Sequence, residues 1–108
     1  STKNTDALIE DLWNYTQKSD YYRGKTTFII GTDHGRGTDP LDSWRSHGTD
    51  IKGSDQTWII IFGKGVKNLG EVTNGGQLYN NQLAPTVRML FKLTQMKEKG
   101  YGLPMRLN

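Results

Sequence analysis

The chain of 108 residues is long enough for one small domain and has a net charge of only +3. It contains no cysteine, which excludes disulfides, cysteine-ligated zinc and thiol catalysis. Hydrophobic residues make up 33% of the chain and glycine occurs 13 times, so we expect part of a larger domain rather than a self-sufficient core.

The first expected elements are a helix and a buried strand. Residues 6–18, DALIEDLWNYTQK, place apolar side chains on one helical stripe, and Thr5 or Asp6 can cap the start of this helix. After a turn at Gly24, residues 26–32 form an apolar run that is too continuous for a half-exposed strand. A helix, a short loop and a buried strand in this order are typical of α/β domains.

The second half of the chain combines a long loop, a strand and a helix. Residues 33–56 are polar and without periodicity, and loops of this length are often functional. Residues 57–63, TWIIIFG, predict a second buried strand, adjacent to the first in one sheet. Residues 82–94 predict a helix with Pro85 in its first turn, and the tail from Gly100 is expected to be irregular. The elements together predict an α/β fold with two central strands flanked by helices.

The sequence predicts neither a membrane span nor a nucleic-acid surface. No stretch approaches about 18 consecutive apolar residues. The basic residues are scattered, and those near the C-terminus are typical of a solvated face. We expect the chain to be a fragment, because it opens on Ser1 almost inside a helix; a targeting segment of the parent protein would then be missing. The compartment stays unknown, since a cysteine-free chain suits the cytoplasm and the periplasm alike.

The two histidines of the chain, His34 and His47, both fall in the long loop. Asp33 and His34 directly follow the first predicted strand, at the end of the sheet where α/β proteins bind ligands. Carboxylate and imidazole suit zinc or manganese, and Gly35 and Gly37 let the backbone turn sharply. Two interpretations compete, a metal site and a hydrogen-bonded turn. A zinc site needs at least three protein ligands, so this segment would supply only part of one.

Four segments, in this order, resemble one protein family. They are TDHGRG, SWRSHGTD, TWIIIFGKGV and NNQLAPTVRMLFKL. The ordered set is similar to the C-terminal part of the alkaline phosphatase superfamily, in particular to its metal-dependent phosphomutases and type I phosphodiesterases. The resemblance covers most of residues 6–93. It implies that residues 1–108 are the C-terminal fragment of a three-layer α/β/α alkaline-phosphatase-like domain, with the rest of that domain upstream.

The resemblance also implies roles for individual residues. Asp33 and His34 would bind the metal ion that holds the nucleophile, and His47 would bind a second ion, zinc or manganese in each case. The nucleophile, a serine or threonine, and further ligands would lie upstream. The fragment alone is then expected to be inactive, whereas the parent would hydrolyse a small phosphate ester. Arg36 is a candidate phosphate contact, because a guanidinium matches phosphate geometry; a solvated arginine is the competing interpretation.

Two alternatives stay open. A phosphomutase of the same superfamily would use the same metal chemistry, with an inserted cap domain outside this chain. From another class, the chain would be a non-catalytic binding module for an acidic partner, with its best patch at Tyr21, Tyr22, Arg23 and Lys25. Chelation should abolish the function of a metal site and leave a binding module unaffected. Substrate identity would be determined by the upstream half.

Overall fold

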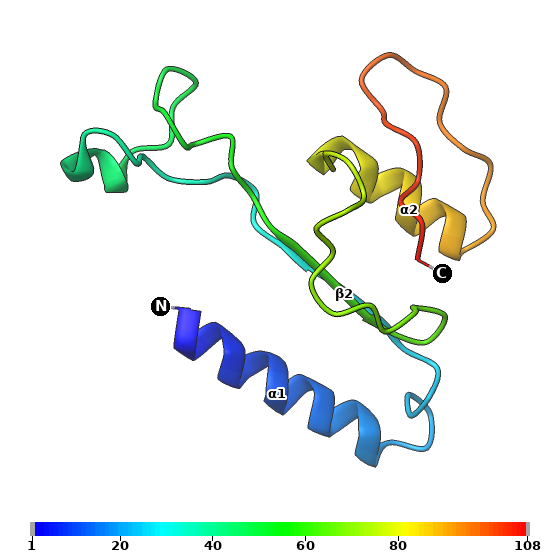
Figure 1. Ribbon diagram of the computed structural model, residues 1–108. Coiled ribbons are helices and arrows are strands. Elements are labelled where there is room, and N and C mark those ends of the chain that lie inside the picture. Colours follow the sequence, from blue (N-terminus) through cyan, green and yellow to red (C-terminus); the bar gives the residue numbers. More distant parts are fainter. Residues whose placement is uncertain (1, 108) are drawn as a thin grey trace.

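The computed structural model describes residues 2–107 and folds them into a small α/β structure. Its elements are α1 (Thr2–Lys18), β1 (Thr27–Gly31), the 3-10 helix η1 (Leu41–Arg45), β2 (Ile59–Gly63), the 3-10 helix η2 (Asn80–Gln82) and α2 (Leu83–Leu90). Figure 1 shows α1 and α2 on opposite sides of the strands, with the loop between β1 and β2 projecting from one end. The structure confirms the predicted α/β fold class.

The two predicted strands are adjacent in one antiparallel sheet, in a register that places Phe28 opposite Phe62. The rings of Phe28 and Phe62 stack with centroids 4.7 Å apart and planes 9° apart. Trp13 of α1 tilts over both rings, at 6.0 Å from Phe28 and 5.7 Å from Phe62. Aromatic pairs of this kind contribute about 0.5–1.5 kcal/mol beyond their buried area. This aromatic cluster is therefore what holds α1 against the sheet.

Both outer edges of the sheet lack a strand partner within residues 2–107. Thr32 N–H donates to Trp58 O (3.4 Å), which makes these two residues a hydrogen-bonded pair of the ladder. Hydrogen-bonded and non-hydrogen-bonded pairs alternate in antiparallel sheets, so Ile29 and Ile61 form a non-hydrogen-bonded pair. Their backbone N–H and C=O groups consequently point outward, away from the neighbouring strand.

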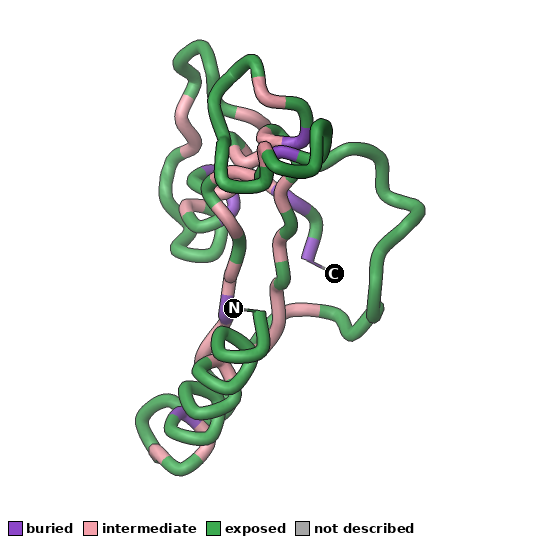
Figure 2. Tube along the Cα trace, turned by 90° about the vertical axis from the view of Figure 1, so that its left-hand side faces the viewer, coloured by how far each residue is buried: buried purple, intermediate pink, exposed green. Residues whose placement is uncertain are grey.

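The strands and α1 are less buried than their sequences predict. Phe28 is the only buried residue of the two strands, and Ile60 is 48% exposed. On α1, Leu8 is 68% and Leu12 is 49% exposed, and Figure 2 shows most of this helix as exposed. The prediction of fully buried strands is therefore wrong for residues 2–107. Each strand has one strand neighbour within residues 2–107, and the outer edge of each is left uncovered by a further strand.

The helix boundaries also differ from the predicted ones. Helix α1 begins at Thr2, so Thr5 and Asp6 lie inside it and do not cap it. Helix α2 ends at Leu90 instead of continuing to residue 94, because Lys92 adopts a left-handed conformation with φ 55°. No helix within residues 2–107 combines the length and the apolar character that crossing a membrane would require.

The C-terminal tail supplies part of the core. Met105 is 3% and Leu107 is 7% exposed. The Met105 N–H donates to the hydroxyl of Thr86 in α2 (2.9 Å), and this fully buried hydroxyl donates to the Gln82 carbonyl (2.7 Å). Leu107 O accepts from Lys67 N–H at 2.7 Å. The tail has irregular backbone, as predicted, but it also packs between α2 and the segment that follows β2.

Candidate metal centre

The loop between β1 and β2, residues 32–58, is held together by its own backbone. Its outgoing limb donates three backbone hydrogen bonds to the returning limb: Gly35 to Ser54, Gly37 to Ser46 and Thr38 to Lys52, at 2.7, 2.9 and 2.9 Å. The 3-10 helix η1 lies at the turn between the limbs. The long polar loop therefore follows a defined path, and side chains on it have defined neighbours.

Two glycines permit the close approach of the two limbs. A Cβ atom at Gly35 would collide with the carbonyl oxygens of Gly53 and Gln56, and one at Gly37 would collide with Ser43. Neither Gly35 nor Gly37 has a positive φ angle. The predicted sharp turn is therefore not the reason for either glycine. Gly35 leaves room for backbone of the returning limb, and Gly37 leaves room for Ser43 of η1.

Asp33 and His34 lie just beyond the carboxyl end of β1. Asp33 Oδ1 is 3.7 Å from His34 Nε2 and accepts the backbone N–H of His34 at 3.0 Å. Two ligands of one tetrahedral zinc ion, each about 2.1 Å from it, lie about 3.4 Å apart. The observed separation is close to that value. The carboxylate is 88% exposed and the imidazole 33% exposed, so both groups are accessible from outside the loop.

The backbone fixes which nitrogen of His34 is available. The Nδ1–H of His34 donates to the carbonyl of Gly35 at 2.7 Å. A carbonyl only accepts, so in the neutral ring the proton is on Nδ1 and the free lone pair is on Nε2. Metal-binding histidines nearly always have their second nitrogen engaged in this way. The nitrogen that faces Asp33 is thus the one that is free to bind an ion.

His47 stacks on His34, with ring centroids 3.9 Å apart and planes 14° apart. Imidazole nitrogens bind metals in the plane of the ring, so two nearly parallel rings suit two neighbouring ions better than one shared ion. No group of three or more His, Cys, Asp or Glu side chains suited to one metal is found in the part of the chain that the structure describes. The structure brings the predicted ligands His34 and His47 together and places Asp33 beside His34. Their role as ligands stays a prediction.

An open hollow of about 810 Å³ lies beside Asp33. Two carboxylates, Asp33 and Asp55, line it, and no lysine or arginine of residues 2–107 does. Carboxylates without a cationic neighbour give the hollow a negative potential, which attracts cations and repels anions. Arg36, the predicted phosphate contact, is exposed and is not among the residues that line the hollow. Its role also stays a prediction.

Asn80 contacts this site although no local sequence pattern indicates it. Its amide donates to the carbonyls of Thr32 and Asp33 and accepts from the hydroxyl of Thr57. An asparagine directly before a helix predicts a helix cap. Its position in the sequence therefore gives no reason to expect contacts with distant segments. The partners of Asn80 are 23 to 48 residues away in the sequence, so no local pattern could have indicated them.

Comparisons with protein-family models, with curated proteins and with solved structures found no significant match. The similarity to the alkaline phosphatase superfamily therefore rests on the motifs in the sequence alone.

Proposed function

We propose that this chain is the C-terminal portion of a two-metal-dependent phosphoryl-transfer hydrolase, a phosphatase or phosphodiesterase of the alkaline phosphatase superfamily. The observation that carries the proposal is the 3.7 Å separation of Asp33 Oδ1 and His34 Nε2, with the other ring nitrogen of His34 already engaged. These two residues would hold one zinc or manganese ion, and His47 would contribute to the site of a second. Bound ions of this kind supply positive charge to the phosphoryl oxygens and activate the nucleophile.

The charge of the hollow beside Asp33 supports this function. A phosphate ester is an anion, and the hollow presents two carboxylates and no cation to it. Such a substrate would be repelled unless divalent cations first reversed the local charge. A phosphate ester bound in this hollow, which neither His34 nor His47 lines, would therefore depend on metal ions and not on a lysine or arginine of residues 2–107.

The donor set of this chain would be completed from outside it. One carboxylate and two imidazoles, divided between two ions, leave each ion with fewer than the three protein ligands that a catalytic zinc site uses. The remaining ligands and the nucleophilic hydroxyl would come from the upstream part of the parent domain. On this basis the isolated chain has no useful hydrolytic activity.

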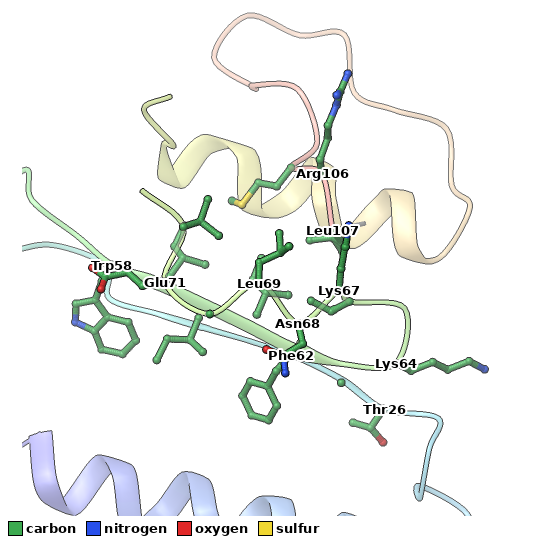
Figure 3. A pocket seen from close by; sticks show the side chains of 18 of the residues that line it. Thr26, Trp58, Phe62, Lys64, Lys67, Asn68, Leu69, Glu71, Arg106 and Leu107 are labelled. Atoms are coloured by element: carbon green, nitrogen blue, oxygen red, sulfur yellow. The ribbon is translucent and has the colours of Figure 1, made fainter. Parts of the chain in front are cut away.

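The open edges of the sheet support the proposal that this chain is one part of a three-layer α/β/α domain. The outward backbone groups of Ile29 and Ile61 are donors and acceptors that further strands would satisfy. A hollow of about 1330 Å³ follows β2, bounded by Trp13 of α1 on one side and by the 66–72 segment and C-terminal tail on the other. Figure 3 shows Leu69 and Leu107 on the tail side of this hollow, opposite Phe62.

The dimensions of the molecule agree with this interpretation. A five-residue strand in a layered sheet occupies about 800 Å³, so the hollow along β2 has room for one. The chain exposes 9050 Å², whereas a folded monomer of its mass exposes about 6,000 Å². Its radius of gyration is 16.2 Å, against about 13 Å for a compact domain of this length. Part of this surface is apolar: Leu8 is 68% and Ile60 is 48% exposed.

The test uses the full-length protein and two substrates, an aryl phosphate monoester and an aryl phosphodiester. We expect hydrolysis that requires added Zn²⁺ or Mn²⁺ and is abolished by a chelator. His34→Ala should reduce kcat/KM by several orders of magnitude, because both charge stabilisation and positioning of the nucleophile would be lost. Transfer of the phosphoryl group to water separates a hydrolase from a phosphomutase, which transfers it between two hydroxyls: the monoester then releases inorganic phosphate, and the diester releases a phosphate monoester.

Asp42→Asn is the matched control for Asp33→Asn, because Asp42 is an exposed aspartate of the same loop. We expect Asp33→Asn to inactivate the protein and Asp42→Asn to leave it active. Hydrolysis that persists in the presence of chelator, or full activity of His34→Ala, would contradict the proposal.

A further inference from the structure

The side chain of Asn80 joins three segments that are far apart in the sequence. Its Nδ2 group donates to Thr32 O at 3.2 Å and to Asp33 O at 3.1 Å, both at the end of β1. Its Oδ1 atom accepts the hydroxyl of Thr57, just before β2, at 3.2 Å. Asn80 itself begins η2, the 3-10 turn that leads into α2. One amide thus ties α2 to the point where the chain leaves β1 for the candidate metal centre.

The chemistry of these partners allows only one orientation of the amide. The two carbonyl oxygens can only accept, so they require the NH₂ end of the amide. The Thr57 hydroxyl then donates to the remaining oxygen. Both hydrogens of the NH₂ group are engaged, and the side chain is half-buried. Asn80 therefore holds Thr32 and Asp33 in a fixed position relative to β2 and α2.

We propose that Asn80 is a positioning residue for the metal ligands Asp33 and His34. The Asp33 carboxylate is 88% exposed, so packing against neighbouring side chains contributes little to its direction. Its direction is determined mainly by the backbone at residue 33, which is the backbone that Asn80 holds. Through Asp33 Oδ1, which accepts the His34 N–H, the same constraint extends to the second ligand. This inference rests on the proposed function, because it assumes that the pair binds an ion.

The expected consequence is a loss of metal affinity. Removal of groups that orient metal ligands typically weakens binding about 10–100-fold. A purely structural role for Asn80 would instead lower the stability of the protein and leave the affinity of the folded protein for the ion unchanged. Metal affinity and the unfolding of the metal-free protein are therefore the two measurements that separate these roles.

Asn81 provides a matched control. It is the next residue, it is exposed, and its Nδ2 also donates to a backbone carbonyl, that of Gly100 at 3.0 Å. That carbonyl is on the C-terminal side of α2, away from the Asp-His pair. Asn80→Ala and Asn81→Ala each remove one side-chain amide that donates to backbone carbonyls. Only the amide of Asn80 donates to the backbone of a predicted metal ligand, Asp33.

The experiment is calorimetric titration of the full-length protein with Zn²⁺ and, separately, with Mn²⁺. We expect Asn80→Ala to raise the Kd of the tighter ion about 10–100-fold and Asn81→Ala to change it less than about threefold. Asn80→Ala, which loses three hydrogen bonds, should lower the unfolding midpoint of the metal-free protein more than Asn81→Ala, which loses one. Equal affinities for Asn80→Ala and Asn81→Ala would overturn the proposal.

Substitutions of Thr57 keep the proposal testable if Asn80→Ala fails to fold. Thr57→Val removes the hydroxyl that orients the Asn80 amide, and Thr57→Ser retains it. We expect weaker metal binding by the valine variant and near-normal binding by the serine variant; equal affinities for the two would overturn the proposal. A wild-type protein that binds neither ion would instead refute the proposed function itself. If the wild-type protein binds an ion and Asn80→Ala binds it equally well, only the positioning role of Asn80 is refuted.

Discussion

The loop that follows β1 and the framework of strands and helices have opposite characters. The loop, residues 32–58, is polar and satisfies many of its backbone groups internally, through bonds such as Gly35 N–H to Ser54 O. The framework has the strongly apolar sequences, yet it leaves Ile60 48% and Leu8 68% exposed and the edges of its sheet unpaired within the described residues. The loop, which has few apolar residues, thus satisfies more of its own contacts than the framework does.

The framework and the loop therefore depend on different contacts for their structure. Under the proposed function, further strands and a further layer would bury the apolar surface of the framework, and its stability would then depend on the rest of the parent domain. The loop keeps His34 and His47 in place through local contacts, and Asp33 is held in addition by Asn80 from outside the loop. Substitutions in the loop should therefore affect ion binding and activity more than folding, and substitutions in the framework, apart from Asn80, should do the reverse. Four predictions, in order of decreasing effect, test this division.

Loss of a buried side chain of the framework should have the largest effect. Met105→Ala removes a side chain that is 3% exposed, and we expect the free energy of unfolding of the full-length protein to fall by about 2–5 kcal/mol. Lys99→Ala, at an exposed lysine just before the tail, is the control and should change it by less than about 0.5 kcal/mol. Chemical denaturation measures both. Similar losses for the two variants would show that the tail is not part of the core.

Steric interference between the limbs of the loop should reduce activity without unfolding the protein. A Cβ at Gly35 collides with backbone carbonyls, and a displacement of about 1 Å near the reacting groups lowers the rate about 10²-fold. We expect that loss of kcat/KM for Gly35→Ala. Gly48→Ala is the control in the same loop, because its Cβ would meet only a side-chain atom of Ile51 at 3.7 Å. Equal activity of the two variants would contradict a fixed path for the loop.

The buried hydroxyl of Thr86 should make a smaller contribution. Thr86→Val keeps the shape of the side chain but leaves the Met105 N–H without its acceptor. A buried donor without a partner costs about 1–3 kcal/mol, and we expect that decrease in the free energy of unfolding. Thr86→Ser retains the hydroxyl and should lose less. If the Thr86→Val variant were as stable as the wild-type protein, the hydrogen bond between Thr86 and Met105 would contribute nothing to stability.

Arg36 should show the smallest effect. An exposed charge contributes at most about 1 kcal/mol to an ionic contact, so we expect Arg36→Gln to raise KM for an aryl phosphate about threefold with little change in kcat. Arg45→Gln, at an exposed arginine of η1, is the control. An unchanged KM would show that Arg36 is a solvated side chain with no contact to substrate.

The sequence predicted the elements that depend on local patterns. The two apolar runs identified β1, β2 and their adjacency, and the order of Asp33, His34 and His47 identified the loop in which these side chains meet. Strand burial was predicted wrongly because continuous apolar residues are typical of a strand covered on both faces, and the sheet of residues 2–107 has two strands with open edges.

Two other features left no local signal. Met105 and Leu107 are in a short irregular segment after Pro104, where neither helical nor strand periodicity can develop, so their burial could not be predicted. The bonds of Asn80 to Thr32 and Asp33 join positions more than 45 residues apart through one side chain. Such contacts depend on the completed fold and cannot be read from spacing.

The most direct test of the central claim is the affinity of the full-length protein for Zn²⁺ and Mn²⁺ before and after Asp33→Asn. The substitution keeps the shape of the side chain and an oxygen for the His34 N–H, but removes the negative charge. Loss of an outer partner alone weakens metal binding about 10–100-fold, so loss of a ligand charge should weaken it by more than about 100-fold. Asp42→Asn should leave the affinity unchanged. Equal affinity of the Asp33→Asn variant and the wild-type protein would show that Asp33 and His34 form only a hydrogen-bonded turn.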